Sequence, residues 1–263
     1  MTQTTDAPIT GAIAGNSTAS ARWTTRALLA AGIAAGPLFL GVGVAQGCAR
    51  EGFDFTRNAI SQLSLGDLGW IQVTGFLLTG VLTIAAAIGM RQALRDAPGG
   101  VWAPRLVGVF GASFLLAGAF TADPGAGFPA GTPEKAAASL SAHGAVHMLG
   151  GMVGYLAFCA ASFVLARLFA ARRRRGWAIA CRLVPVGVLA GFAGSSASVL
   201  AFTIGAGLGL LWLTVLSARL LADVPTAQPW VKTPAACGPG GNAATIQDHH
   251  VRVARVNRTD TAT

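Results

Sequence analysis

The sequence predicts an all-α membrane protein in which six helices cross the bilayer as a bundle. Only 11% of the 263 residues are charged, whereas soluble domains average about 25%. Six mainly apolar runs approach or exceed the roughly 20 residues that a membrane-spanning helix needs. Basic residues also gather in alternate connecting segments, which is the charge pattern of a polytopic membrane protein. These observations exclude a soluble fold for most of the chain.

The six apolar runs follow an N-terminal segment that lacks apolar periodicity. The third run is short unless its helix begins nearer Val101, and the fifth and sixth are separated only by a small polar patch at residues 195–198. One re-entrant hairpin over residues 177–221 is therefore an alternative to two full spans. The predicted spans are residues 27–45, 70–90, 107–120, 145–166, 177–194 and 199–221.

The two ends of the chain differ in composition from the apolar region. Residues 1–26 are rich in Thr, Ala, Gly and Ser, and residues 222–263 mix Pro, Gly, Thr and Asn with scattered charge. Such segments bury too little apolar surface to fold alone. We therefore predict flexible tails on either side of a transmembrane domain at residues 27–221.

The distribution of charge predicts the orientation. Arg22 and Arg26, the loop at 91–105, the run at 172–175 and the C-terminal segment are all basic, whereas the other two loops have a small excess of acid. Because basic loops stay in the cytoplasm, both termini are predicted to be cytoplasmic. The expected location is the inner (plasma) membrane as a multi-pass protein, with the arginine run beside anionic lipids. A nucleic-acid partner is not expected, despite the net charge of +9.

Glycines four residues apart occur in four of the predicted helices. This spacing forms a flat strip on which another helix can approach closely. The second helix can belong to the same chain or to a second copy, so a homo-oligomer through glycine-rich faces is one of two interpretations. The pairs are Gly32 and Gly36, Gly150 and Gly154, Gly187 and Gly191, and Gly205 and Gly209.

Polar residues that can perform chemistry gather in the two predicted external loops. His143 and His147 share one face at the start of the fourth helix, because residues four apart lie one above the other. Asp123 ends the third helix on the same side of the membrane, and Ser61 precedes the second. Ionisable groups near the membrane are costly and often functional. We take these four as candidate catalytic residues, with Asp54 and Arg57 as candidate substrate-binding residues.

Several interpretations of this cluster remain open. Asp123, His143 and His147 form a reasonable zinc ligand set for a metal-dependent hydrolase acting on a lipid-like substrate. Binding or transport of a small molecule or lipid is a second function. In a structural interpretation, Asp123 is a cap, Asp54 and Arg57 form a loop ion pair, and the histidines hydrogen-bond between helices. Haem is disfavoured, because both histidines project from one face of one helix.

Three short motifs resemble one family of prokaryotic membrane proteins. They are the Ser-x-Leu-x-x-Gly-x-x-Gly-Trp stretch from Ser61 to Trp70, Asp123-Pro124, and His143-Gly-x-x-His147. With these motifs the chain resembles the domain of unknown function 998 family over roughly residues 27–221. The resemblance implies a bacterial multi-helix membrane protein with an unassigned biochemical role.

Overall fold

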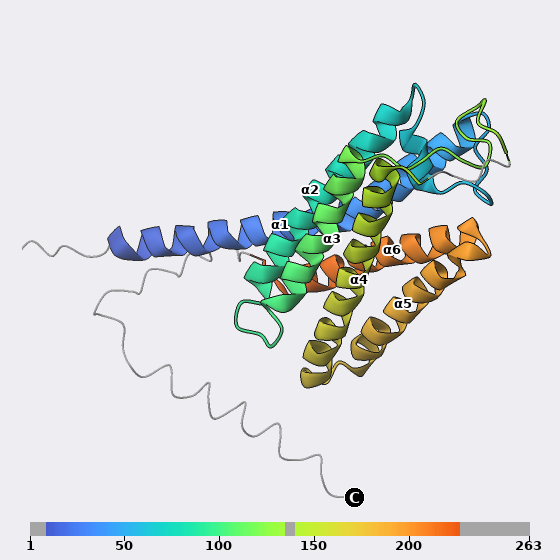
Figure 1. Cartoon of the computed structure of the whole chain (residues 1–263). Coiled ribbons are helices and arrows are strands. Elements are labelled where there is room, and N and C mark those ends of the chain that lie inside the picture. Colours follow the sequence, from blue (N-terminus) through green and yellow to red (C-terminus); the bar gives the residue numbers. More distant parts are fainter. Residues whose placement is uncertain (1–8, 135–139, 227–263) are drawn as a thin grey trace, which may run out of the picture. The chain divides into compact units, whose positions relative to one another are not determined.

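The computed structural model describes residues 9–134 and 140–226, with side chains from residue 20 onward (Figure 1). Regular structure in this part of the chain is helical, apart from one isolated β-bridge between Gly125 and Phe128. The long helices are α1 (Ile9–Ala49), α2 (Gly69–Ala93), α3 (Trp102–Ala119), α4 (Ala142–Ala171), α5 (Arg175–Ala193) and α6 (Val199–Asp223). Two short 3-10 helices lie between them, η1 (Ile60–Ser64) and η2 (Gly194–Ser196).

All six long helices are apolar and long enough to cross a membrane, with mean hydropathy of 1.3 to 2.1 over the best window of each. This confirms the predicted six-helix membrane fold, and the chain is a multi-pass membrane protein. The third helix begins at Trp102, which gives it the length that the shorter apolar run lacked. Residues 175–196 and 199–223 are separate helices of sufficient length, which favours two full spans over a re-entrant hairpin.

The helices contact one another in chain order, and α1 also packs against α6, which closes the arrangement into a ring. The first helix begins at Ile9, inside the segment predicted as an N-terminal tail, although its part long and apolar enough to span is Ser20–Ala49. The predicted C-terminal tail falls mainly on residues 227–263, which lie outside the described residues.

Close helix contacts use the glycines that lie four residues apart in the sequence. A methyl group added at Gly191 would overlap Gly205, so α5 and α6 meet backbone to backbone there. Gly36 faces the backbone of Leu210 between α1 and α6, and Gly154 faces Ser113 between α4 and α3. One member or more of every predicted pair therefore serves packing within the chain. A homo-oligomer remains a prediction.

Phenylalanines fill the space between α1, α2 and α3. The ring centroids of Phe39 and Phe76 are 5.0 Å apart, and those of Phe39 and Phe114 are 5.3 Å apart. Phe110 continues the cluster 5.2 Å from Phe114 and lies 4.9 Å from Tyr155 of α4. The pairs of Phe39 with Phe114, Phe110 with Phe114 and Phe110 with Tyr155 are edge-to-face, a geometry that adds to the stabilisation that burial provides. The cluster fixes α1 to α4 as one packed layer.

The two ends of the bundle differ in their charged residues. We call the end with segments 50–68 and 120–134 the loop end, and the end with segments 94–101 and 172–174 the arginine end. At the arginine end, Asp223 forms an ion pair with Arg219 at 2.9 Å. Longer ion pairs join Asp223 to Arg174 at 3.7 Å and to Arg172 at 3.9 Å. The remaining arginines there are largely exposed.

Candidate functional site

The two segments of the loop end are joined by hydrogen bonds. Asn58 is completely buried, and its Nδ2 donates to the carbonyl oxygens of Gly125 at 3.2 Å and Ala126 at 3.4 Å. Gln62 Nε2 donates to the carbonyl oxygen of Asp123 at 3.2 Å. A buried amide needs such partners, because a lost hydrogen bond there leaves an unpaired polar group. These bonds hold η1 against the segment that follows α3.

A partly exposed arginine side chain stabilises the first of these segments. Arg50 donates from Nη1 to the carbonyl oxygen of Leu63 at 2.6 Å and from Nη2 to that of Leu65 at 2.5 Å. Its guanidinium lies 4.8 Å from the ring centroid of Phe128 in the other segment. Burial lowers the pKa of Arg50, against the opposing effect of the Asp67 carboxylate.

Asp123 anchors the start of α4. Its Oδ1 accepts a hydrogen bond from Ser141 Oγ at 2.5 Å, and its Oδ2 accepts one from the Ser141 backbone N–H at 3.0 Å. Ser141 Oγ in turn accepts from the Gly144 N–H at 3.0 Å, as an N-cap does. A side chain at position 144 would overlap Asp123 Oδ2. Asp123 therefore supports the N-cap of α4, the helix that follows it, as the structural interpretation of this residue proposed.

The two histidines of α4 have different surroundings. His147 is 9% exposed, its Nδ1 lies 2.8 Å from the carbonyl oxygen of Phe120, and its ring is edge-on to Phe76. Because a carbonyl oxygen only accepts, Nδ1 carries the hydrogen, and Nε2 of the neutral ring is an acceptor. His143 is exposed, with its ring 5.2 Å from that of Phe120. The pair shares the start of α4, yet only one member is buried.

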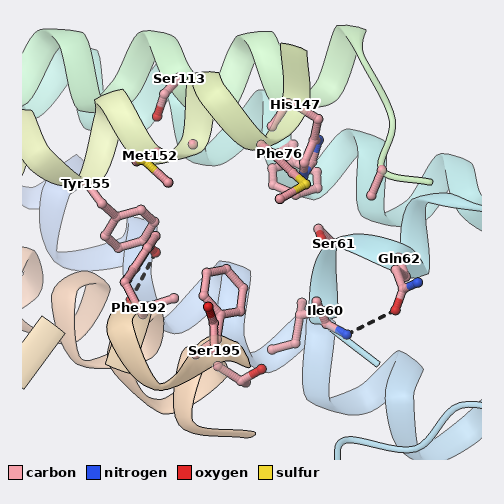
Figure 2. A pocket seen from close by; sticks show the side chains of 18 of the residues that line it. Ile60, Ser61, Gln62, Phe76, Ser113, His147, Met152, Tyr155, Phe192 and Ser195 are labelled. Carbon is pink, nitrogen blue, oxygen red and sulfur yellow. Dashed lines mark hydrogen bonds between the residues drawn. The ribbon is translucent and has the colours of Figure 1, made fainter. Parts of the chain in front are cut away.

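A cavity of about 500 Å³ lies beside this end of α4 (Figure 2). Its polar residues near the loop end are Ser61, Gln62, Asp123 and His147, and most of its remaining lining is apolar. Volumes of about 300–1,000 Å³ are typical of small-molecule sites. The apolar part of the lining comes from all six long helices and includes Phe39, Phe76, Phe114, Met152, Phe192 and Phe202.

The cavity opens along the flank of α4. Met148 and Met152 line it and are 60% and 48% exposed, and Ser195 lines it from the exposed η2 corner. Figure 1 shows α4 and α5 diverging from the turn that joins them, toward the loop end. The exposed residues beside the methionines on α4, among them Leu149 and Val153, are apolar. The opening therefore faces the lipid-exposed side of the bundle.

The predicted substrate-binding pair does not line the cavity. Arg57 Nε lies 3.1 Å from Asp54 Oδ2 and its Nη1 lies 3.7 Å from Glu134 Oε1, on the exposed surface of the loop end. Asp54 also accepts hydrogen bonds from the Thr56 hydroxyl and N–H, and these bonds lower the pKa of Asp54. The arrangement is that of a loop ion pair.

The donor set does not fit a zinc ion. Within residues 9–134 and 140–226, no three Cys, His, Asp or Glu side chains lie close enough to share a metal. Structural and catalytic zinc sites need three or four converging ligands. Asp123, His143 and His147 therefore do not form the zinc site that their types suggested.

A comparison with models of protein families identifies the family of the chain. The profile of a family described as protein of unknown function (DUF998) matches residues 33–219. The chain belongs to this DUF998 family. Searches of curated proteins and of solved structures found no match. The match confirms the family resemblance inferred from the loop motifs and covers all six spans at least in part.

The structure relates the DUF998-like motifs to the cavity. Ser61, Asp123 and His147 come from three separate motifs and line the same cavity. Sequence reasoning missed Arg50, Asn58 and Gln62, which join the loops. A signal was present: Arg50 and the two amides stand in a segment that also holds two phenylalanines and three leucines, where polar groups need partners if the segment packs.

Proposed function

We propose that this DUF998 protein binds a lipid-like amphiphile, with an apolar chain in the cavity and a polar end toward Ser61, Asp123 and His147. The single observation behind the proposal is the cavity itself, which is apolar along most of its length and polar at the loop end. Ligand sites commonly combine an apolar lining with a few convergent polar groups. The ligand enters sideways, past Met148 and Met152.

Methionines at the opening suit a ligand of variable shape. Their side chains are unbranched and adapt to irregular partners. Deeper in the cavity, Ser113 Oγ donates to the Phe110 carbonyl at 2.7 Å and Tyr155 Oη donates to the Ala206 carbonyl at 3.0 Å. Both hydroxyl hydrogens are therefore used within the chain, and most of the other side chains that line the interior are apolar, which suits a hydrocarbon chain.

Hydrolysis of a lipid is the less supported alternative. A serine nucleophile needs a base within hydrogen-bond reach, and no hydrogen bond joins Ser61 Oγ to His147 in the part of the chain with described side chains. The zinc route lacks a ligand set. Transport across the bilayer also has little support, because the spans hold no Asp other than the terminal Asp223, no Glu and no Lys.

The orientation and location belong to the same proposal. The arginine end faces the cytoplasm by the positive-inside rule, so the cavity opens toward the outer half of the plasma membrane. Membrane lipids are then the immediate partners of the chain. Nucleic acid is not a partner, because the arginines lie beside the lipid headgroups.

Photolabelling with an alkyl diazirine of about 16 carbons tests the binding of an apolar chain. In reconstituted vesicles, we expect labelled peptides from cavity-lining parts of α4 and α6, and we expect excess unlabelled amphiphile to reduce that labelling. Gly151 lines the cavity, and an added Cβ there would meet no atom within 4 Å. Gly151→Leu should therefore fill part of the cavity and reduce the labelling several-fold.

Gly41→Leu is the matched control. Gly41 also has no atom within 4 Å of an added Cβ and does not line the cavity. This variant should be labelled like the parent protein. Equal labelling of both variants, or labels restricted to exposed faces such as Leu183 and Val186, would exclude a ligand in the cavity.

A further inference from the structure

The polar end of the cavity has more free acceptors than free donors. Asp123 contributes a carboxylate, and each of its oxygens accepts one hydrogen bond from Ser141, although a carboxylate oxygen can accept two. His147 Nε2 is the acceptor nitrogen of the neutral ring, because Nδ1 donates to Phe120. Gln62 Nε2 donates one hydrogen bond, to the Asp123 carbonyl oxygen, and Gln62 Oε1 accepts from Asn58 and Ala59, so the amide offers a single further N–H.

Hydroxyls supply the remaining polar atoms. Ser61 Oγ makes no hydrogen bond with any residue whose side chain the structure describes, and Figure 2 shows Ser61 beside the cavity. Thr203 Oγ1 lines the cavity from α6, buried and without a partner in the same part of the chain. A hydroxyl both donates and accepts, so it adapts to a ligand that donates.

An anionic headgroup would meet no compensating charge. The lining contains no Arg or Lys among the described residues. The start of α4, whose free N–H groups would attract an anion, is already occupied by the Asp123 carboxylate. A carboxylate or phosphate placed here would face the like charge of Asp123, which is unfavourable.

We infer that the ligand of this cavity carries a hydrogen-bond donor and no acidic group at its polar end: an alkyl alcohol, a glyceride hydroxyl or an alkyl amine. This inference rests on the proposed function and adds the headgroup class. The donor bonds to the Asp123 carboxylate or to His147 Nε2, while Ser61 Oγ completes the contact. Fatty acids and lipid phosphates are disfavoured, because the described lining offers them no cation.

Competition against the diazirine probe tests the headgroup class with three ligands built on a twelve-carbon chain. They are 1-dodecanol, its methyl ether and laurate, which share a chain and differ in donor and charge. One neutral hydrogen bond corresponds to about a three- to tenfold change in affinity. We expect dodecanol to displace the probe at concentrations lower by at least that factor than either the ether or laurate.

Two variants assign the effect to residues. Ser61→Ala removes a hydroxyl without an intrachain partner. The concentrations at which dodecanol and its methyl ether displace the probe should then differ less than in the parent protein. Asp123→Asn removes the charge, and it should improve displacement by laurate relative to the parent. Ser196→Ala, at an exposed position of η2 that does not line the cavity, is the control and should change neither the dodecanol-to-ether nor the dodecanol-to-laurate ratio.

The outcomes separate the two proposals. If none of the three ligands displaces the probe, the binding function itself is wrong. If laurate or the ether displaces it as well as dodecanol does, the cavity binds a chain but the headgroup inference is wrong. If Asp123→Asn does not fold, the parent protein still decides the inference through the ratio of the concentrations at which laurate and dodecanol displace the probe.

Discussion

The loop end and the arginine end of the bundle use their polar residues differently. At the loop end, Asn58, Gln62 and Arg50 bond to backbone carbonyls within the chain. At the arginine end, Arg172 and Arg174 are partly exposed and reach Asp223 only at 3.9 and 3.7 Å. Exposed ion pairs of that length contribute little. The loop-end residues therefore stabilise the folded loops, whereas the exposed arginines contribute little to folding and are available to contact lipid headgroups.

A topology assay tests this comparison with the largest expected effect. A reporter enzyme that is active only outside the cytoplasm is inserted after Pro98 at the arginine end or after Gly131 at the loop end. Both positions lie in exposed segments. We expect activity only from the second fusion, because the arginines remain in the cytoplasm. Activity from both fusions, or from neither, would contradict the orientation.

A glycine substitution tests the start of α4 at the loop end. Gly144→Ala places a methyl group where Asp123 Oδ2 lies, and overpacking of this kind costs about 1–3 kcal/mol. We expect a lower midpoint of thermal unfolding in detergent. Gly151→Ala, on the same helix with no atom within 4 Å of the new Cβ, should unfold like the parent. Equal midpoints for both would show that the cap does not constrain α4.

Removing a buried amide tests the link between the loops. Asn58→Ala removes the donors to Gly125 and Ala126, and the loss of a buried partner costs about 1–3 kcal/mol. The segment 120–134 should then exchange amide hydrogens faster. Arg57→Ala, which breaks only exposed ion pairs, should change the free energy of unfolding by about 0–1 kcal/mol. If Arg57→Ala lowered the free energy of unfolding more than Asn58→Ala did, Arg57 and not Asn58 would be the residue that links the loops.

Acid titration gives the smallest effect. Hydrogen bonds from Thr56 lower the pKa of Asp54 in the folded protein. The ionised carboxylate therefore stabilises the fold at pH values above the ordinary aspartate pKa of about 4. This contribution is lost as the pH falls through the lowered pKa. In Asp54→Asn, the unfolding midpoint should therefore fall less than in the parent between about pH 5 and pH 3. Parallel pH profiles would show that Asp54 does not contribute.

The spans were predictable because length and hydropathy depend on local sequence alone. The start of α3 at Trp102 followed from the length that a bilayer requires. The family was recognisable from the motifs at Ser61, Asp123 and His147, and these three residues do line one cavity. That shared cavity depends on how helices far apart in sequence pack, which a single sequence does not contain.

The different surroundings of the two histidines were not predictable from their spacing. His143 and His147 lie four residues apart on α4, yet burial also depends on which neighbours reach each turn. Phe120 and Phe76 cover His147, whereas His143 lies in the first turn, beyond most of that cover. The cavity was also not predictable from the sequence, because an unfilled volume depends on how the side chains of several helices pack.

The sideways opening beside Met148 and Met152 determines which ligand concentration governs the occupancy of the cavity. A molecule that enters from the bilayer responds to its mole fraction among the surrounding lipids, not to its concentration in the medium. Two amphiphiles with identical affinity for the cavity would then occupy it unequally whenever they partition differently into the membrane. Occupancy would change with the composition of the membrane, even where the amount of protein stays constant.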